Sequence, residues 1–189
     1  MALLLCAALT ACGSSKPRPG PATPSPPPAA TPGRGLTVSS TAFTPDGPIP
    51  PDFTCDGANV SPPLSWSVPA RGAAAYAVVV DDPDAPGGSF THWLLLDLPA
   101  TATSLPQGVP AAERPAIGGV QGRNDGGVTG YSGPCPSGGP AHYYRFTVYA
   151  LDQPLNLAPV PGKGGVLNAM RGHILAQGTL VGTYQRAGR

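Results

Sequence analysis

Three short apolar runs rich in strand-forming residues constrain the fold of this chain most strongly. They span 75–80, 91–98 and 143–151, and turn-forming glycine and proline residues separate them. Runs of this length and composition are typical of buried strands. The sequence therefore predicts a mainly β fold, a sandwich of sheets with a peripheral helix.

The helix is expected near the end of the chain. Leu167, Met170, Ile174 and Leu175 recur at helical spacing after two glycines, a pattern that indicates an amphipathic helix. Gly178 is the expected end of this helix.

Length and charge limit the possible functions. The chain has 189 residues, enough for one folded domain with a sizeable core. Its formal net charge is only +1, and it lacks the basic surface that binding to nucleic acid requires. We therefore expect no nucleic-acid partner.

The N-terminal residues look like a targeting signal. Residues 1–11 form an apolar run that is too short to span a bilayer. Residues 9–12 read Leu-Thr-Ala-Cys and resemble the bacterial lipobox, in which the cysteine is lipidated and becomes the new N-terminus. We expect a lipoprotein signal peptide at 1–11, and lipidated Cys12 anchoring an exported protein to the outer face of the cell membrane. The alternative is an ordinary cleavable signal.

A proline-rich segment follows. Residues 12–35 combine many prolines with alanine, threonine and serine, a composition that favours extended polyproline II structure over packing. We expect a disordered linker here and a folded domain at 36–189. A role as a Pro-x-x-Pro ligand is the less favoured alternative.

The predicted domain contains two cysteines, Cys55 and Cys135. Two cysteines in an exported domain indicate a disulfide. The competing interpretation makes Cys135 a nucleophile with His142 as its base.

Strand alternation groups the candidate site residues. It places His92 on the face of Leu94, opposite Trp93, and it places His142 and Tyr144 together on one face of the later run. The predicted companions of His92 are Leu94, Leu96 and Leu98. The third histidine, His173, is interpreted as a surface or packing residue.

Two aspartates extend this cluster. If 75–80 and 91–98 pair as antiparallel strands, Asp82 and Asp84 come near His92, on a loop stiffened by prolines. Histidine and tyrosine donate to phosphate or carboxylate oxygens, and aspartate fixes a histidine tautomer. We expect a pocket for a small anion. In the alternative interpretations, the aspartates merely cap backbone amides, or the cluster holds a metal, for which the spacing is poor.

Several motifs resemble one family. They are 53–66, 82–86 with His92-Trp93, 130–136 with His142 and Tyr144, 170–176 and 182–184. Over residues 37–186, the chain resembles the phosphatidylethanolamine-binding protein family in its bacterial Raf-kinase-inhibitor-like branch.

The resemblance implies two packed antiparallel sheets with a few short helices. It also implies a pocket for phosphate, acetate or phosphorylated head groups. From the matching motifs, the residues expected to line this pocket are Asp82, Asp84, His92, Pro134, His142 and Tyr144. Two positions depart from the pattern: Tyr143 stands where the family often has arginine, and Ser137 where a second proline is common.

The expected function is that of a membrane-tethered binding protein with an anion or phospholipid head-group pocket, and with no cofactor and no catalytic residue. The alternatives are a protein-interaction or serine-protease-inhibitor role with an unknown protein partner, and a hydrolase that uses the Asp/His cluster. The sequence contains no Gly-x-Ser-x-Gly elbow, phosphate loop or clear metal spacing, so catalysis is the weakest hypothesis.

Overall fold

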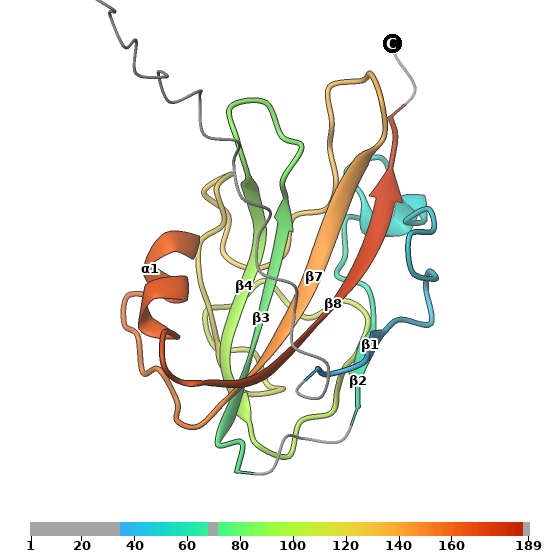
Figure 1. Cartoon of the computed structure of the whole chain (residues 1–189). Coiled ribbons are helices and arrows are strands. Elements are labelled where there is room, and N and C mark those ends of the chain that lie inside the picture. Colours follow the sequence, from blue (N-terminus) through green and yellow to red (C-terminus); the bar gives the residue numbers. More distant parts are fainter. Residues whose placement is uncertain (1–34, 68–71, 187–189) are drawn as a thin grey trace, which may run out of the picture. The chain divides into compact units, whose positions relative to one another are not determined.

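Within the described residues, five antiparallel strands form the main sheet in the order β6-β4-β3-β7-β8 (Figure 1). The structure is a computed structural model and describes residues 35–67 and 72–186. The strands are β3 (Ala75–Asp82), β4 (Phe90–Pro99), β6 (Val120–Gln121), β7 (His142–Leu151) and β8 (Ile174–Tyr184). The three predicted runs are β3, β4 and β7, and β3 pairs with β4 in the expected antiparallel sense.

The predictions for the N-terminal part of the chain lie outside the described residues. They are the signal peptide 1–11, the lipidated Cys12 and nearly all of the linker 12–35. Among the residues that the structure describes, no helix is long and apolar enough to cross a membrane.

A smaller antiparallel sheet packs against the main one. Its strands are β1 (Val38–Ser39), β2 (Leu64–Trp66) and β5 (Ser104–Leu105), in the order β1-β2-β5, and the 3-10 helix η1 (Pro51–Phe53) precedes β2. Side chains of both sheets form one buried apolar cluster, which includes Val38, Leu64, Trp66, Val78, Trp93 and Phe146. The prediction of a mainly β fold with two antiparallel sheets is confirmed. The two sheets pack together because each buries its apolar face against the other.

The opposite face of the main sheet is covered by the helix α1 (Lys163–Ala169). Val166 and Met170 pack there against Val79 of β3 and Leu94 of β4 in a second buried cluster. In Figure 1, α1 lies on the other side of the long strands from β1 and β2. The main sheet is therefore buried on both faces, which explains why β3 reads as a continuous apolar run.

The predicted helix ends earlier than expected. It stops at Ala169, Gly172 adopts a positive φ of 81°, and Ile174 already belongs to β8. The prediction for Ile174 and Leu175 was wrong, because pairing with β7 along its whole length outweighs local helical spacing. Gly178 does not end a helix. It lies within β8, where an added Cβ would come 1.9 Å from the Leu36 carbonyl oxygen.

A β-bulge in β4 changes which side chains share a face. Tyr76 pairs with Leu98 and Val78 pairs with Leu95, so β4 contains one residue more than β3 in this interval. Asp97 takes a positive φ of 57° at the bulge. Leu98 therefore packs in the cluster between the sheets and not with Leu94, which corrects the alternation expected from the sequence.

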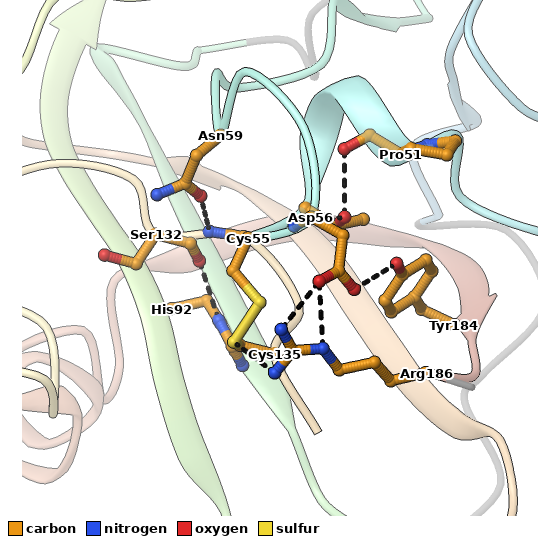
Figure 2. Close-up of a disulfide and its surroundings, with 11 residues drawn as sticks. Pro51, Cys55, Asp56, Asn59, His92, Ser132, Cys135, Tyr184 and Arg186 are labelled. Carbon is orange, nitrogen blue, oxygen red and sulfur yellow. Dashed lines mark hydrogen bonds and ion pairs between the residues drawn. A yellow bond between two sulfur atoms is a disulfide. The ribbon is translucent and has the colours of Figure 1, made fainter. Parts of the chain in front are cut away.

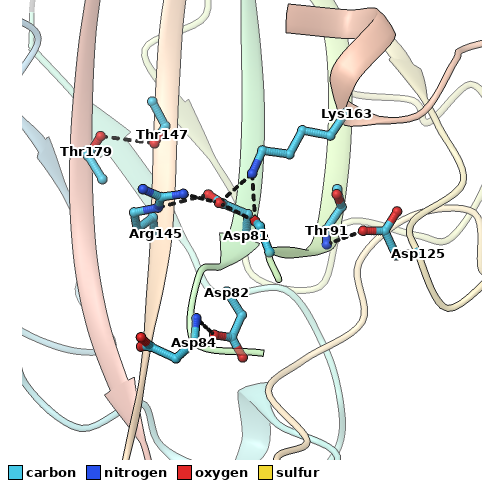
Figure 3. A network of polar contacts seen from close by, with 10 residues as sticks. Asp81, Asp82, Asp84, Thr91, Asp125, Arg145, Thr147, Lys163 and Thr179 are labelled. Carbon is cyan, nitrogen blue, oxygen red and sulfur yellow. Dashed lines mark hydrogen bonds and ion pairs between the residues drawn. The ribbon is translucent and has the colours of Figure 1, made fainter. Parts of the chain in front are cut away.

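A buried carboxylate connects α1 to the sheet. Asp81 of β3, only 3% exposed, accepts hydrogen bonds from Arg145 of β7 and, at 2.6 Å, from Lys163 of α1 (Figure 3). Burial alone would raise the pKa of Asp81, but the hydrogen bonds from Arg145 and Lys163 outweigh burial and hold its pKa below the ordinary value. The ionised carboxylate is thus the form that the fold stabilises.

This network predicts an acid-dependent loss of stability. Because the pKa of Asp81 is lowered on folding, its contribution is complete above the unfolded-state value of about 3.9 and is lost as the pH falls through the folded-state value. We expect Asp81→Asn to lower the free energy of unfolding at pH 7 by about 2 kcal/mol and to flatten its dependence on pH below about 4.

Urea unfolding between pH 3 and pH 7 measures both effects. Asp152→Asn is the matched control, because Asp152 pairs with His173 at a site that is 44% exposed, where such pairs contribute about 0–1 kcal/mol. If the pH profile of the Asp81→Asn variant is parallel to that of the wild type, the stabilising role of Asp81 is refuted.

Candidate functional site

A pocket of about 340 Å³ lies where β3 ends and where β4 and β7 begin. This size is typical of sites that enclose a small ligand. The residues that line it come from these strands and from two loops, 83–89 and 131–141. They are Asp82, Ala85, Pro86, Phe90, His92, Ser132, Gly133, Cys135, Pro136, Ser137, His142 and Tyr144.

A second bulge brings His92 into the pocket. Val80 pairs with Trp93 and Asp81 pairs with Thr91, which leaves His92 as the extra residue of β4. Its ring lies 5.3 Å from the ring of Tyr144, measured between centroids. The prediction that His92 shares the face of Leu94 was therefore wrong: the bulge moves it to the face of Tyr144.

The orientation of His92 is fixed by a backbone contact. Its Nδ1 lies 2.7 Å from the carbonyl oxygen of Ser132, and the Ser132 amide donates back to the His92 carbonyl (Figure 2). Asn124 donates to the Ser132 hydroxyl at 2.8 Å and so supports the same loop. Burial lowers the pKa of His92, and the contact with Ser132 and the nearby Asp82 charge oppose this only in part. The ring is therefore neutral at neutral pH.

His142 is held by a carboxylate. Its Nδ1 lies 2.8 Å from Oδ2 of Asp82, and both side chains are largely buried. The other oxygen of Asp82 accepts a hydrogen bond from the Asp84 amide at 2.8 Å (Figure 3). Asp82 thus binds His142 directly, whereas it acts on His92 only through its charge.

Tyr144 completes the polar wall. As predicted, it shares a face with His142, and the two rings stack with centroids 6.4 Å apart. Its hydroxyl oxygen is buried, and no group in the described part of the chain meets it with hydrogen-bond geometry, although the Asp82 side chain is near enough to act on it. Burial first, and then the charge of Asp82, raises the pKa of this hydroxyl, so it keeps its proton. A buried hydroxyl without a partner is costly, and a ligand oxygen in the pocket would satisfy it.

Two predicted residues lie beside the pocket and not on its lining. A carboxylate oxygen of Asp84 accepts a hydrogen bond from the Tyr143 amide at 2.9 Å, so Asp84 ties the loop after β3 to β7. Pro134 is buried, and its carbonyl oxygen accepts a hydrogen bond from the Cys55 amide. Both residues position the walls of the pocket. Asp82, His92, His142 and Tyr144 are brought together on its surface.

A disulfide joins Cys55 to Cys135, 80 residues apart, and Cys135 lines the pocket (Figure 2). The adjacent Gly133 leaves no room for a side chain, because a Cβ would lie 2.2 Å from the Phe53 carbonyl oxygen. Asp56 next to the disulfide pairs with Arg186 at 2.7 Å. With its sulfur bonded to Cys55, Cys135 is not a free nucleophile for His142, so the structure supports the predicted disulfide.

The sequence did not single out Phe90, whose ring lies 4.9 Å from that of His92. Strict alternation already places Phe90 on the face of His92. Because its side chain is apolar, the search for polar groups did not assign it to the site. Ser132 lies within the motif 130–136, but its role could not be predicted, because its contact with His92 is made by the backbone carbonyl oxygen and not by the side chain. Across residues 35–67 and 72–186, no group of three or more His, Cys, Asp or Glu side chains is arranged to hold a metal ion.

The β sandwich, with a pocket bounded by two histidines, a carboxylate and a tyrosine, defines a class of small-ligand binding domain. The sequence profile described as phosphatidylethanolamine-binding protein matches residues 39–185. The chain therefore belongs to the phosphatidylethanolamine-binding protein family, which binds anions and phospholipids.

Known relatives agree with this assignment. A UPF0098 protein of Methanothermobacter thermautotrophicus is 46% identical over 80% of this chain and 99% of its own length. The protein named "Putative lipoprotein LppC" of Mycobacterium tuberculosis is 46% identical over 85% of this chain and 76% of its own. The crystal structure of E. coli YbcL, described as a new member of the mammalian family, matches with a TM-score of 0.70 at 34% identity, over 80% of this chain and 98% of that one.

The disulfide generates a stability prediction. Closing a loop of 80 residues stabilises the folded state by about 4 kcal/mol in the chain-entropy description. We expect the double variant Cys55→Ser/Cys135→Ser to lose about that amount in guanidinium unfolding. Wild-type protein unfolded in the presence of a thiol reductant is the matched comparison, and its midpoint should fall to that of the double variant. An unchanged midpoint in reductant would contradict the structural role of this bond.

Proposed function

We propose that this chain is a membrane-tethered binding protein whose pocket takes a small anion or a phosphorylated head group. The observation that carries the proposal is the buried Tyr144 hydroxyl, which has no partner within the described residues and lies beside two histidines in a pocket of ligand size. Membership of the family supports the ligand class. Within the family, the motifs favour the bacterial Raf-kinase-inhibitor-like branch.

Two side chains supply polar groups for an anion. The Tyr144 hydroxyl stays protonated and can donate a hydrogen bond to a ligand oxygen. Nδ1 of His142 faces Asp82, so Nε2 is the nitrogen of His142 that is left for a ligand. Phe90 and Pro86 line the pocket and exclude water from these contacts. Hydrogen bonds made there are consequently stronger than they would be on an open surface.

Binding is proposed in preference to catalysis. In the described part of the chain, no serine, threonine or cysteine donates to Nε2 of His92 or His142, as an activated nucleophile would. The polar groups of the pocket are instead tied to backbone and carboxylate partners that hold them still. Such an arrangement suits a fixed ligand more than proton transfer.

The tether is proposed to be a lipid on Cys12, followed by the linker 12–35. It is supported by the sequence of residues 9–12 and by the relative named as a lipoprotein in Mycobacterium tuberculosis. The disulfide is consistent with export. Multiple acyl chains make a firm anchor, so the pocket would work close to the outer face of the cell membrane.

Titration with phosphoethanolamine tests the pocket. We expect saturable shifts of the ring resonances of His92 and His142 in NMR spectra of the protein in detergent solution, because both rings line the pocket. His173 is an internal control, since it bonds to Asp152 and Gln153 outside the pocket. His142→Gln should weaken binding about tenfold, and His173→Gln should leave it unchanged. The proposal fails if phosphoethanolamine, phosphate and acetate all leave both rings unshifted.

Detergent partitioning tests the tether. Expressed in a bacterial host, the wild-type chain should enter the detergent phase, and Cys12→Ser should move to the aqueous phase because it lacks the thiol that accepts lipid. Cys135→Ser is the control for cysteine loss, since Cys135 is bonded to Cys55 inside the domain. Equal partitioning of wild type and Cys12→Ser would refute lipid anchoring.

A further inference from the structure

The pocket contains a hydrogen-bond acceptor where an anion site is expected to have only donors. Nδ1 of His92 lies 2.7 Å from the Ser132 carbonyl oxygen, which accepts and cannot donate. The proton of the neutral ring is therefore on Nδ1, and Nε2 has a free lone pair. No group in the described residues hydrogen-bonds to this Nε2.

The surroundings of His92 favour its neutral form. It is 5% exposed, and its ring lies close to the rings of Phe90 and Tyr144. Burial in this aromatic setting lowers the pKa of His92 despite the acidic groups around it. The charged and titratable groups that face the pocket histidines or lie just behind them are Asp81, Asp82, Asp84, Asp125, Tyr144, Arg145 and Tyr184.

Asp82 adds a second acceptor. Its carboxylate receives one hydrogen bond from His142 and one from the Asp84 amide, which leaves further lone pairs on the two oxygens. Asp82 also lines the pocket. A ligand made only of anionic oxygens would therefore face a lone pair on His92 and a negative charge on Asp82, with no proton between them.

We propose that the pocket selects phosphomonoesters in the form that carries a P–O–H group, in preference to anions of the same size and charge that have no acidic hydrogen. The ligand's O–H donates to Nε2 of His92, while another of its oxygens accepts from the Tyr144 hydroxyl. This inference rests on the proposed function and specifies its ligand.

A matched pair of ligands isolates the single proton. At pH 5.5, below the second pKa of a phosphate ester at about 6, methyl phosphate is mainly a monoanion, like methyl sulfate, and the two differ chiefly by one O–H. An acceptor left facing an anionic oxygen costs about tenfold in affinity or more. The tighter binding of methyl phosphate should diminish toward pH 7.5, where it loses this proton. Methyl sulfate keeps its charge and reports the titration of the pocket itself.

Calorimetric titration of the full chain in detergent measures the affinities of methyl phosphate and methyl sulfate and tests this preference without a variant. At least tenfold tighter binding of methyl phosphate at pH 5.5 supports the proposal. Equal affinities overturn it and leave the proposed anion pocket intact. If neither ligand binds, and phosphoethanolamine also fails, the proposed function falls and the inference falls with it.

A variant pair tests the part played by His92. The amide of His92→Gln can donate to a ligand oxygen as well as accept, so the affinity ratio between the two ligands should shrink to about twofold. His173→Gln is the matched control and should retain the wild-type ratio, because His173 lies outside the pocket lining. A wild-type ratio in His92→Gln would overturn the role assigned to His92.

Competition experiments identify the source of the phosphomonoester. Glycerol 3-phosphate presents the group in solution, and vesicles containing phosphatidic acid present it on a membrane. Displacement of methyl phosphate by either one supports the proposal and names the source. If methyl phosphate binds and neither competitor displaces it, the proposed class of ligand is wrong.

Discussion

Two successive buried carboxylates on the central strand set the main constraint on this structure. Asp81 and Asp82 end β3 and point to opposite faces of the sheet. A buried charge is tolerated only when it is paired, so each face must bring partners to it. On one face Arg145 and Lys163 satisfy Asp81, and on the other His142 satisfies Asp82. The same requirement thus fixes α1 on the sheet and one histidine in the pocket.

Much of the fold could be predicted because its signals are local. The apolar composition of β3, β4 and β7 indicated strands, and the antiparallel pairing of β3 with β4, which the sequence analysis assumed, is what the structure shows. The end of the helix could not be predicted in this way, because the ten pairs between β7 and β8 are long-range contacts. Ile174 and Leu175 satisfy a helical pattern as well as a strand, and only the neighbouring strand decides between them.

The site was predictable to the extent that its chemistry lies in side chains. The sequence indicated Asp82, His92, His142 and Tyr144, and all four line the pocket. The face of His92 was predicted wrongly, since a bulge is an extra residue relative to a partner strand and has no signal in one strand alone. Asp84 and Pro134 were expected on the surface of the pocket, but their contacts are with backbone groups, which residue type does not reveal.

The irregular wall of the pocket depends on bonds to distant parts of the chain. The segment 131–137 contains no strand or helix, yet it carries the carbonyl oxygen that sets the tautomer of His92. Asn59 accepts from the Gly133 amide at 2.7 Å, and Cys55 covalently fixes Cys135. Both anchors follow η1, so a short turn between β1 and β2 holds the loop whose carbonyl oxygen contacts Nδ1 of His92. Because a carbonyl oxygen can only accept, a loop fixed in this way makes His92 an acceptor and gives the pocket its selectivity.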